Sequence, residues 1–471
     1  MGLVDFPGLE NIKKLISVSE CGNLTACINS KKEINMEDCR ITARKLQAQL
    51  VKFLGVFSPH FSKPRLGFLA DMLYGIQASG DVKLSEISRE LINRERCTPK
   101  KKEERLSRHL IAEDMTNAIN HAVLGDAKKY ITGRTLIVTD PTDLQKRYAR
   151  KMEGLSKVYD GSNGDVGDNL GYSGVAMVAC NPETREMIPL HLSFWSKTEE
   201  GYKSDTDKVY GAIRDVVGVI GTKGVHVFDR GGDDIKLFQL YDELGVDFIV
   251  RLVGNRNVVS WKKVGTAEKF SRETIFRYRD VVETEGVGAR RAFTVEYGVV
   301  PVRLEAMPGR VFHMVSVRPL ARSAEFPDLK PMMLLTTLAT STSREALCEV
   351  IDGYYRRWMI EETIRFVKCS YHLEDIRLLT LRGIKNMASI ILATIYFGSV
   401  WLGKRVKCGV IFRTVVEMSQ RMGEVGGFLY YALASGLRRV FSRGGSWKGM
   451  MPVENDTEDR QMMLPNVDWS G

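Results

Sequence analysis

The spacing of apolar residues changes in character along the chain. Up to about residue 130, apolar side chains recur every three or four positions, as in ITARKLQAQLVKFLGVF and GFLADMLYGIQASG, which is the period of an amphipathic helix. From residue 135 they gather in short β-branched runs that are typical of strands, namely TLIVT, GVAMVAC, IPLHLSF, VHVF and VDFIVRL. A helical stretch, residues 204–221, separates the third run from the fourth, with Ser204 or Asp205 as its N-terminal cap. Strands interleaved with helices predict an α/β sheet.

A second, basic set of strands follows. Residues 251–337 hold few helical stretches and carry turn signals at VGNRN, EGVGARR and MPGR. Residues 251–320 contain 13 Lys and Arg against 7 Asp and Glu. Helical patterns return at SREALCEVIDGYYRRW and continue to about Leu437, and the chain ends in a segment rich in Gly, Pro and polar residues. We therefore expect a basic β insertion between two parts of the α/β core and a loosely held C-terminal tail.

Composition adds a weak indication of a polyanionic partner. The chain of 471 residues carries 68 Lys and Arg against 58 Asp and Glu, a formal charge of +10, which favours a partner such as nucleic acid. The eight cysteines are scattered without a CxxC pair, so we expect reduced thiols. The N-terminus has no export pattern. One apolar run, Met387 to Gly403, approaches membrane-spanning length, but its polar residues favour a buried core helix.

Two of the apolar runs end in an acid. LIVTD finishes at Asp140 and VHVFD at Asp229, and the carboxyl edge of an open α/β sheet is where such folds bind ligands. Two carboxylates on neighbouring strands repel each other unless a divalent metal lies between them. Each Asp taken alone could equally start a turn or cap a helix. Their neighbours Asp143, Asp233 and Asp234 look better suited to capping.

The segment YYRRWMIEETIRFVK, residues 354–368, is expected to form one helix. Separations of three, four and seven place Tyr354, Arg357, Glu361 and Lys368 on one face. An exposed, ion-paired face would explain this spacing by itself. The aromatic neighbours, however, indicate a partly covered face, where Glu361 needs a metal or a cation as partner.

These four residues carry a resemblance to a known family. Tyr354, Arg357, Glu361 and Lys368 match the YREK signature of bacterial insertion-sequence transposases of the insertion-sequence-four type. Asp140, Asp229 and the basic β insertion before Glu361 extend the resemblance to about residues 130–410. It implies a ribonuclease-H-like core whose Asp140, Asp229 and Glu361 hold two Mg²⁺, with Mn²⁺ as an alternative. It also implies that Tyr354, Arg357 and Lys368 contact phosphates of double-stranded DNA at the transposon end.

The resemblance also implies a role for Trp261 and a domain organisation. Relatives can hold a flipped base with an aromatic residue of the insertion, and Trp261 is the tryptophan in that segment; a structural aromatic is the alternative. A homodimer on DNA and a cytoplasmic bacterial location without membrane contact follow by the same resemblance. The expected organisation is a helical DNA-binding domain (1–130), a first core part (131–252), the β insertion (253–340), a second core part with the YREK helix (341–410), and a helical region with the tail (411–471).

Other interpretations remain open at this point. The chain could be a catalytically silent DNA-binding regulator derived from a transposase, or a ribonuclease-H-like nuclease without strand transfer. The stretch VKLSEISRELINRERCTPKKKEERLSRHL resembles a helix-turn-helix in outline, but a charged helical hairpin explains it equally well. His191 and His226 lie within strand-like runs and are expected in the core or at a sheet edge rather than as metal ligands.

Overall fold

The computed structural model describes most of the chain between residues 36 and 449. The exceptions are 92–96, 147, 159–168, 185, 287–288, 321–330, 339–342, 406–407, 420–429, 445–446 and 448, together with the side chains of 282–293. Beyond residue 449 the predicted C-terminal tail lies outside the described residues, as does most of the turn between the two helices of the possible helix-turn-helix. The prediction of a loosely held tail is wrong for its first part, because residues 438–443 belong to a helix and Trp447 is buried.

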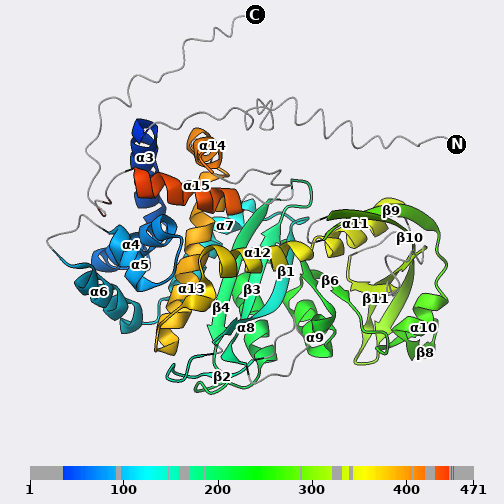
Figure 1. Cartoon of the computed structure of the whole chain (residues 1–471). Helices are drawn as coiled ribbons and strands as arrows, with labels where there is room; N and C mark the ends of the chain where they lie inside the picture. Colours follow the sequence, from blue (N-terminus) through cyan, green and yellow to red (C-terminus); the bar gives the residue numbers. More distant parts are fainter. Residues whose placement is uncertain are drawn as a thin grey trace, which may run out of the picture.

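A mixed sheet crosses the middle of the molecule and continues to its far end (Figure 1). Its strand order is β2-β3-β1-β5-β6-β12-β11-β10-β7-β8, with β4 on β3 and β9 on β10. Strands β1, β5 and β6 pair in parallel, and the remaining ladders are antiparallel. The strands are β1 (Leu136–Gln145), β2 (Ser156–Lys157), β3 (Leu170–Cys180), β4 (Met187–Trp195), β5 (Val225–Phe228), β6 (Asp247–Arg251), β7 (Asn257–Ser260), β8 (Lys263–Thr266), β9 (Tyr278–Gly286), β10 (Ala289–Leu304), β11 (Met307–Pro319) and β12 (Met332–Thr336). The predicted α/β architecture is confirmed at this level.

Helices cover the core part of the sheet and form a separate layer at one end (Figure 1). Those before the sheet are α3 (Met36–Leu54), α4 (Lys63–Ser79), α5 (Leu84–Glu90), α6 (Pro99–Ala112), α7 (Thr116–Ala127) and η1 (Lys128–Tyr130). Those between and after the strands are α8 (Asp205–Ile220), η2 (Arg230–Gly232), α9 (Ile235–Leu244), α10 (Ala267–Arg272), α11 (Arg344–Tyr355), α12 (Trp358–Ser370), η3 (Leu373–Asp375), α13 (Leu381–Tyr396), the π-helical η4 (Phe397–Leu402), α14 (Gly409–Glu417) and α15 (Tyr430–Arg443). Ser204 caps α8, as predicted, by accepting a hydrogen bond from the backbone N–H of Asp207.

Helices from the two ends of the chain pack together. Helix α15 lies against α3 and α4, which Figure 1 shows in red and blue. Beyond α15, the buried Trp447 stacks on Tyr74 with ring centroids 4.7 Å apart. Its Nε1 donates to Asp71 Oδ1 at 2.8 Å, and Arg105 binds the other oxygen of the same carboxylate. The C-terminal segment therefore completes the core of the N-terminal helices.

The apolar run near residue 390 is a core helix, as predicted. Among the described residues, the stretch Leu381–Leu402 is the one helix long and apolar enough to cross a membrane, and 89% of its most apolar window is buried inside the protein. Helix α13 packs on β4, α7, α4 and α6. Burial at the centre of the helical layer accounts for its apolar composition.

Candidate active site

Two acids occupy matching positions on neighbouring parallel strands. The β1–β5 ladder pairs Leu136 with Val225 and Val138 with Val227, and the same offset brings Asp140 level with Asp229. Equivalent positions on adjacent strands direct their side chains to the same face. The backbone therefore places the two carboxylates beside each other.

The prediction that β1 ends at Asp140 is wrong. β1 continues to Gln145 because β3 pairs with it antiparallel along this whole length, including Asp140 with Ala176 and Gln145 with Gly171. Only the pairing with β5 stops earlier, at Val138. Asp140 thus lies just beyond the end of the parallel β1–β5 pairing. Its own strand continues, paired with β3 alone.

The position of Asp229 is fixed by the turn that follows it. Asp229 caps η2, and its Oδ1 accepts a hydrogen bond from the backbone N–H of Gly231 at 2.7 Å. A Cβ on Gly231 would lie 3.0 Å from that oxygen, and one on Gly232 would lie 2.7 Å from the Phe228 ring. The DRGG sequence therefore allows a tight turn that anchors one carboxylate oxygen and leaves the other available.

The predicted single helix over residues 354–368 is two helices. α11 ends at Tyr355 and α12 begins at Trp358. At the junction the backbone N–H of Arg357 bonds the carbonyl of Tyr354 at 3.0 Å, a three-residue spacing that tightens the turn. α11 packs on β5, β6, β11 and β12, whereas α12 packs on β1 and β3. The two helices therefore pack on different strands. Glu361 lies in the first turn of α12, which packs on β1, the strand that carries Asp140.

Glu361 is held by Arg357 in this structure. The Arg357 guanidinium donates to Glu361 Oε1 at 2.6 Å, with 50% of the glutamate side chain and 19% of the arginine side chain exposed. Burial raises the pKa of Asp140 to about 7, Arg357 opposes the rise, and the negative charges of Asp229 and Glu361 add to it. The three acids are thus electrostatic neighbours, with Arg357 among them.

The carboxylate oxygens of Asp140, Asp229 and Glu361 suit a hard divalent cation. The three carboxylates are, however, not gathered around one point in this structure. Among the described residues, no three His, Cys, Asp or Glu side chains are gathered so as to hold a metal ion. Asp140 nevertheless keeps a proton near neutral pH because it is buried beside two other acids. A cation bound by carboxylate oxygens would remove that repulsion. The oxygen ligands present are thus of the kind that such a cation takes, and Glu361 is bound by Arg357 in this structure.

The proton on Asp140 gives a pH prediction for the metal-free protein. Because the folded-state pKa of Asp140 is raised to about 7, the folded state holds a proton that the unfolded state loses near pH 4, so this group lowers stability as pH rises from about 4 to 7. In EDTA, the Tm of Asp140→Asn minus that of the wild type should therefore be smallest near pH 4 and should increase as the pH rises to 7 and above. A difference in Tm that does not change with pH would contradict the raised pKa of Asp140.

Lys368 lies at the far end of α12 and is bound by acids. Its Nζ donates to Asp143 Oδ1 at 2.9 Å and lies 3.3 Å from Glu374 Oε1. Asp143 was expected to cap a following element; instead it lies on β1, paired with Ser173, and binds this lysine. Its Oδ2 is buried without a hydrogen-bond partner among the described atoms. Lys368 and Asp143 therefore form a largely buried ion pair that links α12 to β1.

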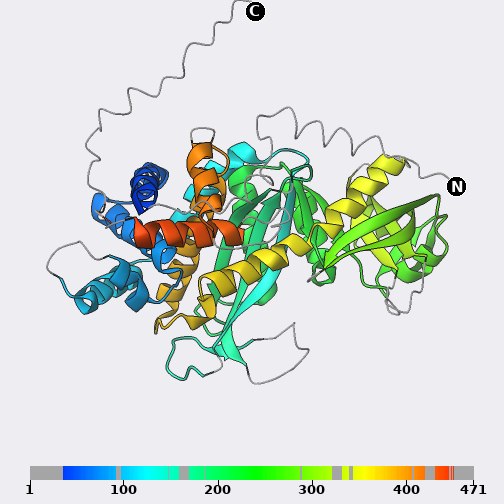
Figure 2. The same ribbon diagram turned by 45° about the horizontal axis from the view of Figure 1, so that its top comes forward.

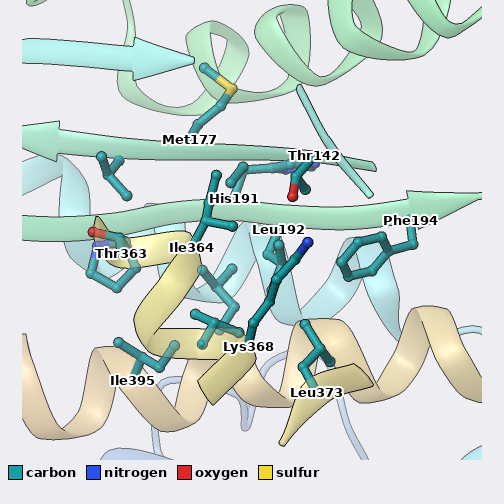
Figure 3. A pocket seen from close by; sticks show the side chains of 15 residues that line it. Thr142, Met177, His191, Leu192, Phe194, Thr363, Ile364, Lys368, Leu373 and Ile395 are labelled. Carbon is teal, nitrogen blue, oxygen red and sulfur yellow. The ribbon is translucent and has the colours of Figure 1, made fainter. Parts of the chain in front are cut away.

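A small cavity lies beneath α12 (Figure 3). It measures about 30 Å³, and side chains of α12, β3, β4 and α13 line it, almost all of them apolar. Lys368 and His191 are among its few polar lining residues. The face of α12 that carries Thr363, Ile364 and Val367 thus rests on the sheet over a small unfilled space.

The two aromatic residues assigned to DNA differ in exposure. Tyr354 is only 7% exposed and packs near Tyr355 at the end of α11. Trp261 is 79% exposed at the tip of the β7–β8 hairpin. Trp261 and Lys262 both have positive φ, 49° and 64°, which two-residue hairpins require but which bulky residues adopt at a cost. An exposed tryptophan held in a strained turn is typical of a binding residue.

The remaining acids and histidines have structural partners or a core position. Asp234 caps α9, as predicted, by accepting from the backbone N–H of Lys236. Asp233, also expected to cap, instead binds Arg256 at 2.6 Å and the backbone N–H of Val253 at 2.7 Å, so it ties η2 to the start of the insertion. His191 and His226 are buried, as predicted, and burial lowers the pKa of each to about 4.

One residue of the site escaped the sequence analysis. The β5–β6 ladder pairs Val225 with Asp247 and Phe228 with Val250, so the same offset brings Arg251 level with Asp229. Asp140, Asp229 and Arg251 thus form a row across three parallel strands. The positive charge of Arg251 opposes the rise that burial causes in the pKa of the Tyr355 hydroxyl. A rule extended from acids to any charged residue near the end of a strand-like run would have found it, because Arg251 lies next to the end of the run VDFIVRL.

Comparison with known proteins identifies the family of the chain. Residues 131–397 match the family model described as Transposase DDE domain. Among solved structures, the chain is similar to the piggyBac transposase synaptic complex with hairpin DNA, determined by cryo-EM, at 10% identity, 94% coverage of this chain, 87% coverage of that chain and a TM-score of 0.35. No curated protein matches the chain. Because the family match spans more than half of the chain and contains all three acids, the protein belongs to the DDE-domain transposases.

Proposed function

We propose that the chain binds the ends of a transposon and catalyses metal-dependent cleavage and strand transfer of DNA, as a member of the insertion-sequence-four type with a ribonuclease-H-like core. The observation that carries this proposal is the row of Asp140 and Asp229 on parallel strands with Glu361 as their electrostatic neighbour. Two further residues of the YREK set lie near Glu361 in the chain: Arg357 binds Glu361, and Lys368 lies close to the C-terminal end of α12.

The residues divide the chemistry among them. Asp140, Asp229 and Glu361 would hold divalent cations, two Mg²⁺ or Mn²⁺ by family resemblance, which would supply Lewis-acid stabilisation of the scissile phosphate and an activated hydroxyl. Asp140 would hold a cation in its ionised form. With Glu361 bound to a cation, the Arg357 guanidinium would be available to pair with a DNA phosphate bidentately. Arg251, level with Asp229, is placed to bind the next phosphate.

The partners and location follow from the same assignment. Tyr354, Lys368 and Trp261 would contact the transposon end, with Trp261 holding an unstacked base. Two ends are brought together by a homodimer assembled on DNA, in the bacterial cytoplasm. The proposed domains keep the boundaries 1–130, 131–252, 253–340, 341–410 and 411–471.

A cleavage and joining assay tests the proposal. The substrate is a duplex that carries the inverted repeat found beside the reading frame, incubated with the full chain, supercoiled target plasmid and Mg²⁺. We expect nicking at the repeat boundary and a joined product, and neither in EDTA. Cleavage without joining would indicate a nuclease, whereas specific binding without cleavage would indicate a silent regulator.

A further inference from the structure

A basic aromatic loop follows the strand that carries Asp140. We call Lys146 and residues 148–151, YARK, the Tyr148 loop; Arg147 lies outside the described residues. The side chain of Tyr148 is 94% exposed, and Arg150 and Lys151 are exposed beside it. Basic side chains beside an exposed aromatic ring are typical of surfaces that bind nucleic acid.

The base of the Tyr148 loop is firmly held. The backbone N–H of Lys146 donates to the carbonyl of Leu170, and its Nζ donates to the carbonyl of Ile376 at 2.8 Å. On the other side, the backbone N–H of Glu153 donates to the carbonyl of Leu379 at 2.8 Å, and its carboxylate accepts from the backbone N–H of Leu381 at 2.9 Å. The loop is therefore anchored to the segment that follows α12.

The charges around the loop are uncompensated. Arg150, Lys151 and the exposed Arg377 form no ion pair among the described residues. The nearby acids are already bound: Glu374 lies with Lys368, and Asp375 binds Lys83 at 2.9 Å. A phosphate backbone would supply the missing negative charge.

The Tyr148 loop and Trp261 lie on opposite sides of the acids. Helices α11 and α12, in yellow, run from the β insertion toward the connection that follows β1 (Figure 2). At one end Arg344, the first residue of α11, binds Asp280 of β9. At the other end the segment after α12 holds Lys146. Glu361 lies between these ends, so the insertion lies on one side of Glu361 and the Tyr148 loop on the other.

We propose that the Tyr148 loop binds the duplex that flanks the transposon end. This inference rests on the proposed function, in which Trp261 and the insertion take the transposon side of the cut. Six strand residues from Asp140 to Lys146 cover about 20 Å at roughly 3.3 Å each. That length corresponds to about six base pairs at about 3.4 Å each. Arg150 and Lys151 pair with phosphates there, while the Tyr148 ring packs on a deoxyribose and its hydroxyl donates to a phosphate.

The test compares two labelled duplexes in EDTA, which prevents cutting. One carries the transposon end with 12 flanking base pairs and the other stops at the cleavage position. Affinities of the full chain, of Tyr148→Ala and of Arg150→Ala/Lys151→Ala are measured across salt concentrations. Arg214→Ala/Lys223→Ala, which removes two exposed cations from α8 and the turn before β5, is the matched control.

We expect losses on the flanked duplex alone. Tyr148→Ala should bind it about tenfold more weakly, the effect of one aromatic contact. The double variant should lower its salt slope by about 2, for two phosphates. Equal losses on both duplexes would place the loop on the transposon end, and unchanged affinities would leave it without a DNA role; either result overturns the inference. If the wild type binds neither duplex, the proposed function falls as well.

Discussion

Glu361→Gln should abolish DNA cleavage while leaving end binding intact. Glutamine keeps the size of the side chain and can still accept the hydrogen bond from Arg357, but it loses the charge that a divalent cation requires. Loss of a direct ligand should cost more than the roughly 10–100-fold that outer-shell partners cost. Cleavage in Mg²⁺ and binding in EDTA are measured with the same flanked duplex.

The neighbouring acid provides the control for this substitution. Glu362 lies beside Glu361 on α12, but it binds Arg365 at 2.6 Å and does not contribute to the raised pKa of Asp140. Glu362→Gln should therefore retain cleavage. If Glu361→Gln cleaves as well as Glu362→Gln does, Glu361 has no catalytic role and the spacing of the helix reflects surface ion pairing.

Lys368→Met should destabilise the protein as well as weaken DNA binding. It leaves Asp143 with neither oxygen bonded, because the described atoms offer Oδ2 no partner and Oδ1 relies on Lys368. Removing one member of a buried pair costs roughly 3–5 kcal/mol. Because the side chains of Lys368 and Asp143 are 22% and 18% exposed, we expect a loss of unfolding free energy near the lower end of this range. Denaturant unfolding measures it.

A double variant separates the two roles of Lys368. In Lys368→Met/Asp143→Asn no unpaired carboxylate remains, so most of the lost stability should return. Its salt slope for end binding should stay lower than that of the wild type by about 1, because one phosphate contact is missing. A wild-type slope in the double variant would show that Lys368 acts only as the partner of Asp143.

The local parts of this structure could be predicted from the sequence. Apolar runs located β1, β3, β4, β5 and β6, because alternation and β-branching are properties of neighbouring residues. The same runs led to Asp140 and Asp229, whereas Arg251 was missed because only acids at the ends of the runs were considered. Ser204 and Asp234 could be recognised as caps because capping depends on the next three residues.

The parts that depend on distant partners could not be predicted. β1 runs past Asp140 because β3, more than thirty residues later, pairs with it. The YYRRW segment holds no Gly or Pro to mark the break between α11 and α12, which arises because the two helices pack on different strands. The spacing of Lys368 suggested a free cation, but Asp143, 225 residues away in the sequence, binds it.

The central claim is that Asp140, Asp229 and Glu361 bind divalent metal together when DNA is present. The most direct measurement is anomalous scattering from Mn²⁺ in crystals of the full chain bound to a transposon end. We predict anomalous peaks between the three carboxylates, with Glu361 turned away from Arg357. Crystals that hold DNA across this edge of the sheet but show Mn²⁺ elsewhere, or none, would contradict the account.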